Sequence, residues 1–146
     1  MSIELNETAL RRHFGTVCPV PVIVVHRTRV EADFEMTAAE RQLQSAFGSE
    51  NRRDEYLIGR SALKSALAAI GKSEDTAAIG WPSPFCSLSH SHGHAVAVAY
   101  GDGKGIGIDV QLRRMPALAV ADRILSGQTL AYWKSLPETE QAKQLQ

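Results

Sequence analysis

Apolar positions recur along this chain with two different periods, which predict a mixture of helices and strands. In 52–70, apolar and small residues recur at three- and four-residue intervals and form one stripe, so the pattern predicts a helix that Gly71 ends. Thr37 and Glu40 have the spacing of a capping box, in which each side chain satisfies a backbone donor at a helix start. We therefore expect a shorter helix over 37–47.

Runs of β-branched and small apolar residues predict strands. The segment 20–25 is rich in valine and isoleucine, and two nearby prolines restrict it to a sheet edge or a strand start. The segment 87–100 predicts two strands flanking a turn, and 105–110 predicts a further short strand. Helical spacing returns after Pro116. The fold class expected from these patterns is α/β (α+β), with the 52–70 helix packed on the sheet.

Length and charge narrow the classes of function. A chain of 146 residues has room for one hydrophobic core, and a glycine-rich turn near Asp102 divides it into a first lobe, 1–103, and an incomplete second lobe, 104–146. Sixteen basic residues balance sixteen acidic ones, so no global field favours nucleic acid. Two isolated cysteines are typical of a reducing compartment, and we find neither a signal peptide nor a membrane-length apolar segment. We expect a cytoplasmic protein without a membrane partner.

The first group of candidate binding residues contains Ser89 and the histidines that follow it. His90, His92 and His94 alternate, so on one continuous strand they would point to one face, where they could hold zinc. In a second interpretation, Ser89 and His90 lie at a strand end and donate hydrogen bonds to a phosphate. An ordinary polar turn is the third. The residues alone leave all three open.

Two further pairs have spacings that suit a binding site. Arg53 and Arg60 are seven residues apart, hence on one helix face, where two guanidinium groups could bind a phosphate, although a solvated basic face is commoner. Asp109 and Gln111 alternate along the predicted strand and would point to one side. Asp109 could serve there as a Mg²⁺ ligand or cap a turn.

Four sequence blocks combine these residues in a fixed order. The blocks are Arg52, Arg53, Glu55, Gly59, Arg60, Ala66 and Leu67; then Trp81, Pro82 and Ser87-Leu88-Ser89-His90; then Gly107-Ile108-Asp109-Val110; and last Arg123-Ile124-Leu125-Ser126. In order and spacing they resemble the 4'-phosphopantetheinyl transferase superfamily, particularly the group that contains the enterobactin-synthetase component. The resemblance covers roughly 52–138.

The resemblance implies the fold of that superfamily and the transfer of 4'-phosphopantetheine from coenzyme A to a serine of an acyl or peptidyl carrier protein. By position, Arg60, Ser89 and His90 would bind coenzyme A phosphates, and Arg53 could add to them. Asp109 would hold the catalytic Mg²⁺. Gln111 stands where the superfamily has a second carboxylate, and an uncharged amide attracts a hard dication less strongly.

The resemblance also implies groups that this sequence does not supply. The chain ends at Gln146, where the superfamily's Lys-Glu-Ala helix would follow, so we expect a C-terminally truncated second lobe. Three functions stay open: a transferase, a catalytically impaired pseudoenzyme that binds coenzyme A or a carrier protein, and a metal-binding module that uses the histidine row. Small members of the superfamily place active sites between identical subunits, which leaves a homo-oligomer open.

Overall fold

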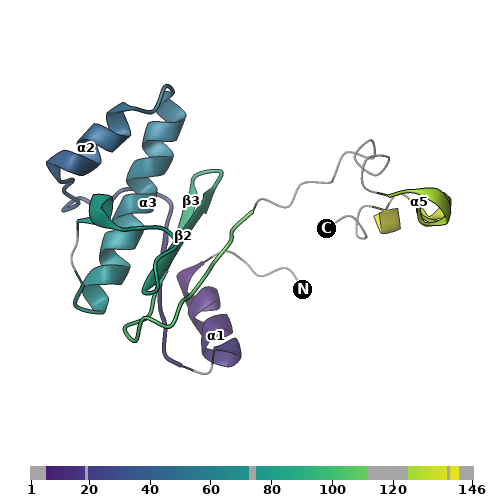
Figure 1. Ribbon diagram of the computed structural model, residues 1–146, viewed down its shortest axis with the longest axis horizontal. Coiled ribbons are helices and arrows are strands. Elements are labelled where there is room, and N and C mark those ends of the chain that lie inside the picture. The colour runs from purple at the N-terminus through teal and green to yellow at the C-terminus, as the bar shows by residue number, and fades with distance from the viewer. Residues whose placement is uncertain (1–5, 19, 73–74, 112–124, 138, 142–146) are drawn as a thin grey trace. The chain divides into compact units, whose positions relative to one another are not determined.

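The computed structural model describes residues 6–18, 20–72, 75–111, 125–137 and 139–141, which belong to two compact units, 1–111 and 112–146. The first unit is a mixed α/β structure with a three-stranded antiparallel sheet of order β1-β3-β2 (Figure 1). Its described elements are α1 (Glu7–Val17), β1 (Ile23–Arg27), α2 (Ala38–Ser45), α3 (Glu50–Ala69), the 3₁₀ helix η1 (Thr76–Ala78), β2 (Cys86–Ser91) and β3 (His94–Ala99).

The long helix α3 has the predicted start and end signals. The Ser49 hydroxyl accepts a hydrogen bond from the Arg52 amide at 3.3 Å, which caps the first turn. Gly71 adopts a φ of +69°, and the amides of Gly71 and Lys72 each donate to a carbonyl of the last turn at 3.0 Å. This is the Schellman arrangement, which favours glycine because the left-handed φ is strained for other residues. The predicted helix at 52–70 is confirmed.

The strand predictions before Tyr100 are also confirmed. The strand β1 lies at an edge of the described sheet, as the neighbouring prolines indicate. β2 and β3 form a hairpin whose turn residues, His92 and Gly93, have φ values of +50° and +77°. Two successive positive φ values are typical of the tight hairpin turns that match strand twist.

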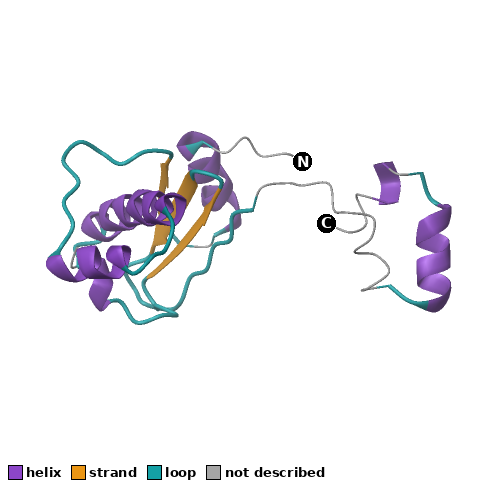
Figure 2. Cartoon of the chain, turned by 90° about the horizontal axis from the view of Figure 1, so that it is seen from above, coloured by secondary structure: helices purple, strands orange, loops and turns teal. Residues whose placement is uncertain are grey.

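The sheet is covered on both faces by apolar side chains. On one face, α3 packs its buried residues against alternate positions of all three strands, and on the other face α1 packs against the remaining positions (Figures 1 and 2). The α3 face buries Val25, Ala62, Leu63, Ala66, Leu67, Cys86, Ala95, Ala97 and Ala99. The α1 face buries Leu10, Val24, Val96 and Val98. This two-sided burial explains why β3 is apolar along nearly its whole length.

The segment 105–110 differs from its prediction, because it forms no strand. The amides of Ile108 and Val110 donate to the hydroxyls of Ser87 and Ser89 at 3.1 and 2.9 Å, and not to the carbonyls of a neighbouring strand. The apolar residues of the segment pack over the α1 face of the sheet. The alternation of apolar and polar residues was therefore predicted correctly, but the segment follows β2 through serine hydroxyls and does not join the sheet as a strand.

The second unit contains α5 (Gly127–Ser135), which is organised around one buried aromatic residue. Trp133 is 3% exposed, and its indole N–H donates to the Gln141 carbonyl at 3.0 Å. The Gln141 side chain in turn donates to the Leu136 carbonyl at 2.7 Å. The helical pattern expected after Pro116 and the residue Arg123 lie outside the described residues.

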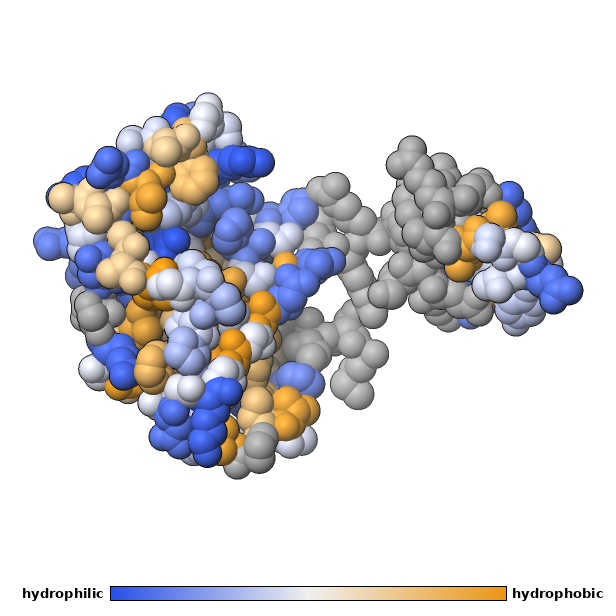
Figure 3. All heavy atoms as spheres, in the orientation of Figure 1, coloured by the Kyte–Doolittle hydropathy of each residue, from blue (hydrophilic) through white to orange (hydrophobic). Residues whose placement is uncertain are grey.

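Polar and apolar residues are interspersed over the face of the first unit that Figure 3 shows. The large apolar side chains that are exposed in the described parts are dispersed along the chain, at Val17, Val20, Leu43, Trp81 and Tyr132. None of the described helices combines the length and the apolar composition that crossing a membrane requires.

Candidate functional site

Gly59 of α3 lies against β2. It is the point where the sequence block that contains Arg60 meets the block Ser87-Leu88-Ser89-His90. A Cβ atom at Gly59 would lie 3.3 Å from Leu88 Cδ2 and 3.9 Å from His90 Cδ2. Only a residue without a side chain lets α3 approach β2 this closely without displacing Leu88. The contact therefore places Arg60, the next residue of the helix, and His90, on the strand, around the same glycine.

The Arg60 guanidinium is fixed by two contacts. Its Nη1 donates to the Thr76 carbonyl at 3.1 Å, and its Cζ lies 4.8 Å from the centre of the Tyr56 ring. Burial raises the pKa of the Tyr56 phenol above its ordinary value, although the Arg60 charge opposes this rise. The hydrogen bond to Thr76 uses one of the five guanidinium N–H groups, so others can bind an anion.

Arg53 lies further toward the start of α3. Its Nη1 donates to the Phe47 carbonyl at 2.9 Å, and the Phe47 ring packs against Tyr56 with the ring centres 5.4 Å apart. The two arginines are thus linked through one aromatic pair, and Arg53 also ties α3 to the segment that follows α2.

Ser89 and His90 lie on opposite faces of β2, because successive strand residues alternate. The His90 Nδ1 lies 3.9 Å from Glu55 Oε2 of α3, and the His90 side chain is 45% exposed. A protonated His90 would form an ion pair with this carboxylate, and its remaining N–H stays available to a ligand. Glu55 is thus the acidic neighbour of His90.

Ser89 belongs to a second group, with Asp109 and Gln111. The Ser89 hydroxyl donates to Asp109 Oδ1 at 3.2 Å, and the Gln111 amide donates to Asp109 Oδ2 at 2.7 Å. Both donors hold the exposed carboxylate in place. The structure thus brings these three residues together, with Ser89 on β2 and with Asp109 and Gln111 on an extended segment that is not a strand.

The Asp109 carboxylate suits Mg²⁺ in one respect. Mg²⁺ needs one or two carboxylates, with water and substrate phosphates completing its shell, and Asp109 offers one carboxylate with unused lone pairs. Across the described residues, however, no three His, Cys, Asp or Glu side chains are grouped as a metal site would require. Asp109 therefore fits a hydrated cation that a phosphate ligand helps to hold.

The predicted histidine row does not form. His92 occupies the hairpin turn, and the register places His90 opposite Ala95, so His90 and His94 point to opposite faces of the sheet. The left-handed turn interrupts the alternation on which the row depended. His94 instead meets His26 of β1, with Nδ1 and Nε2 3.0 Å apart and the rings nearly parallel.

Sequence reasoning missed the tertiary role of Glu40. Its carboxylate is 0% exposed and accepts hydrogen bonds from the Thr76 amide at 2.9 Å and from the Thr37 amide at 2.8 Å, while Lys64 Nζ lies 2.9 Å away. Burial raises the pKa of Glu40, but the hydrogen bonds from these partners outweigh it and hold the pKa below its ordinary value. The capping-box signal identified the Thr37 contact alone.

No protein-family model matches this chain, and no curated protein matches it.

Proposed function

We propose that this chain acts as a 4'-phosphopantetheinyl transferase, moving the phosphopantetheine arm of coenzyme A to a serine of an acyl or peptidyl carrier protein. In this proposal, the first unit has the fold of that superfamily's first lobe. Arg60 and His90 bind coenzyme A phosphates beside Gly59, with Arg53 adding positive charge nearby, and Ser89 orients Asp109, which with Gln111 holds Mg²⁺.

The contact at Gly59 is the observation that supports this proposal best. The Gly-Arg step and the Ser-Leu-Ser-His block are far apart in sequence, and a shared phosphate site requires them to be adjacent. The close packing of Gly59 against Leu88, with His90 in ordinary contact range, brings the two blocks together as this requirement asks. A merely solvated basic face on α3 would not require such a close approach.

In this proposal, these residues neutralise the charge of the coenzyme A phosphates and hold the phosphates in position. Phosphoryl transfer gains most from cationic groups that are already oriented, and Arg60 is held in one plane by Tyr56 and Thr76. His90 would donate a ring N–H to a phosphate oxygen, while its Nδ1 lies 3.9 Å from the Glu55 carboxylate. Bound Mg²⁺ would neutralise charge on the pyrophosphate of coenzyme A. The carrier serine then attacks the phosphorus that bears pantetheine, and 3',5'-adenosine bisphosphate leaves.

One observation favours a second candidate, a protein that binds coenzyme A without turnover. The residue two positions beyond Asp109 is a neutral amide, and it donates a hydrogen bond to the carboxylate instead of adding a charge. A single carboxylate binds Mg²⁺ less strongly than two. Gln111→Glu should therefore tighten Mg²⁺ binding in the presence of coenzyme A if Asp109 is a ligand.

Activity is tested by incubating the purified chain with coenzyme A, Mg²⁺ and an apo carrier protein, followed by intact-mass measurement of the carrier. A carrier that gains the mass of phosphopantetheine supports the transferase. An unchanged carrier, together with measurable coenzyme A binding, supports the second candidate. Absence of both results refutes the site.

Binding is tested by calorimetry with coenzyme A and with 3',5'-adenosine bisphosphate. Arg60→Ala and His90→Ala should each weaken binding by about 1.5–3 kcal/mol, because each removes a charge-assisted hydrogen bond. Arg29→Ala removes an exposed arginine outside the proposed site and is the matched control. Equal binding by the wild type and both site variants would refute the assigned residues.

A further inference from the structure

Two histidine rings meet at the end of the sheet, on the face that α1 covers. His26 of β1 alternates with the buried Val24, and His94 of β3 alternates with the buried Val96, so both rings lie on that face. His26 Nε2 lies 3.0 Å from His94 Nδ1, and the two ring planes differ by 4°. The 5.2 Å between the ring centres is close to this contact distance plus the radii of the two rings. The rings are therefore edge to edge in nearly one plane, and each nitrogen points at the other.

Hydrogen-bond chemistry determines how many protons this pair can hold. A neutral imidazole has one N–H and one bare nitrogen, so the contact needs one ring as donor and the other as acceptor. The outer nitrogen of the donor ring is then bare. One added proton binds that outer nitrogen and leaves the hydrogen bond intact. A second added proton must bind the acceptor nitrogen inside the contact, so it breaks the bond and places two positive rings against each other.

Charged groups beside the pair act on His26 in opposite directions. Burial is the main cause that lowers the pKa of His26, and the positive charge of a protonated His94 lowers this pKa further. The Glu7 carboxylate raises the pKa, and the Arg27 guanidinium lowers it. Glu7 lies in the first turn of α1 and accepts hydrogen bonds from the His26 amide at 3.3 Å and from Arg27 Nη1 at 3.2 Å. Glu7 thus joins the start of α1 to the β1 residue that carries the ring.

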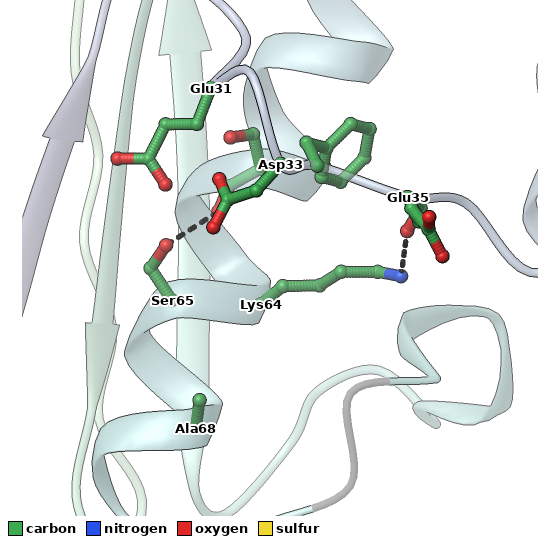
Figure 4. A pocket seen from close by; sticks show the side chains of 8 residues that line it. Glu31, Asp33, Glu35, Lys64, Ser65 and Ala68 are labelled. Atoms are coloured by element: carbon green, nitrogen blue, oxygen red, sulfur yellow. Dashed lines mark hydrogen bonds between the residues drawn. The ribbon is translucent and has the colours of Figure 1, made fainter.

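Further acidic groups belong to the loop that follows β1. Figure 4 shows Glu31, Asp33 and Glu35 of this loop beside α3. Glu31 pairs with Arg27 Nη2 at 2.6 Å, which connects the loop to the residue next to His26. Carboxylates ordinarily titrate near pH 4, roughly two units below a histidine. A measurement on the histidine rings themselves therefore separates their protonation from that of the loop.

We propose that the His26–His94 pair is a pH-sensitive switch, which holds β1, β3 and the start of α1 together until it binds a second added proton and then opens. The rings join the two strands, and Glu7 joins α1 to the same end of β1. β1 is an edge strand with one neighbour in the described sheet, so opening of the pair loosens its end. A metal ion fits the pair less well, because nitrogens that point at each other do not converge on a third point. The described residues also contain no group of three metal-ligating side chains.

The first test is an NMR titration of the histidine ring protons in the full chain, from about pH 8 to about pH 4. We expect the signals of both rings to show two steps more than about one pH unit apart, as coupled groups do. His26→Gln and His94→Gln assign the signals, and in each variant the remaining ring should titrate in one step. His13→Gln removes an exposed histidine of α1 and should leave both steps unchanged.

Hydrogen exchange measures the opening itself. Through the second step, and after correction for the intrinsic pH dependence of exchange, amides at the end of β1 should exchange about tenfold faster or more, whereas amides of α3 keep their protection. In His94→Gln, two positive rings cannot meet at this contact. The acceleration at β1 should therefore be lost in this variant.

Three outcomes would overturn the proposal. A single step for each ring in the wild type would show that the rings do not share a proton. Faster exchange of α3 amides together with those of β1 would identify global unfolding instead of a local opening. Unchanged exchange at β1 through the second step would show that the strand stays in place. The pair contains no residue of the proposed transferase site, so this proposal and coenzyme A binding can fail separately.

Discussion

Replacement of Glu40 by glutamine should reduce the free energy of unfolding by about 2–4 kcal/mol. The carboxylate accepts bonds from Thr76 through Oε1, and it meets Thr37 and Lys64 through Oε2. A glutamine keeps the first oxygen but replaces the second by an amide NH₂, which faces two donors. One neutral hydrogen bond and one charge-assisted bond are lost.

The magnitude follows from these two losses. A neutral hydrogen bond contributes about 0.5–1.5 kcal/mol and a bond between charged groups about 1.5–3 kcal/mol. Removing one partner of a buried ion pair costs about 3–5 kcal/mol, because the other charge stays buried. Lys64 is 12% exposed and still donates to the Glu35 carbonyl at 2.5 Å, which keeps the total toward the lower figures.

Urea denaturation followed by circular dichroism measures this change, with Glu50→Gln as the exposed control, which should stay within about 0.5 kcal/mol of the wild type. The pKa of Glu40 is lowered in the folded state, so its contribution is complete above the unfolded pKa of about 4.5 and is lost as the pH falls through the folded pKa. The difference between wild type and Glu40→Gln should therefore close in acid. A variant as stable as the control, or a difference that does not change with pH, would refute the reasoning.

Three further predictions test the packing at Gly59, the pKa of His26 and the buried hydroxyl of Ser61. Gly59→Val should lower the free energy of unfolding by about 1–3 kcal/mol in urea denaturation, because the valine side chain meets Leu88. Ala69→Val, at an exposed position of the same helix, should lower it less. Equal losses in the two variants would contradict the close approach of α3 to β2. Burial is the main cause that lowers the pKa of His26, so the wild type should lose stability as the pH falls below about 6.5. His26→Gln should flatten this dependence in thermal unfolding scans. Parallel curves of stability against pH for the wild type and the variant would contradict the prediction. The Ser61 hydroxyl on α3 is buried and has no hydrogen-bond partner among the described residues, so Ser61→Ala should raise the free energy of unfolding by up to about 1 kcal/mol; a loss of stability would show that the hydroxyl has a partner.

The candidate site was only partly predictable from the sequence. Local patterns identified Ser89, His90, Asp109 and Gln111, but they could not show that Ser89 and Asp109 bond to each other, since that contact depends on where the 105–110 segment packs on the sheet. The transferase interpretation depends on a resemblance, and it stays a prediction.

Features that depend on neighbours along the chain were determined by the sequence itself. The capping box at Thr37, the Schellman end at Gly71 and the edge position of β1 all follow from interactions within a few residues or from the geometry of proline. A periodic pattern also fixes which side of α3 is apolar, because the helix repeat converts spacing into direction.

Features that depend on partners far along the chain were decided by the tertiary structure. Whether His90 and His94 share a face depends on where the hairpin turns, and a turn of two residues reverses the expected alternation. The spacing of Thr37 and Glu40 is enough to indicate a helix cap. Only packing against Thr76 and Lys64 makes Glu40 a buried anion. The physical reason is common to both: spacing specifies direction within one element, whereas burial and charge pairing arise only when separate elements meet.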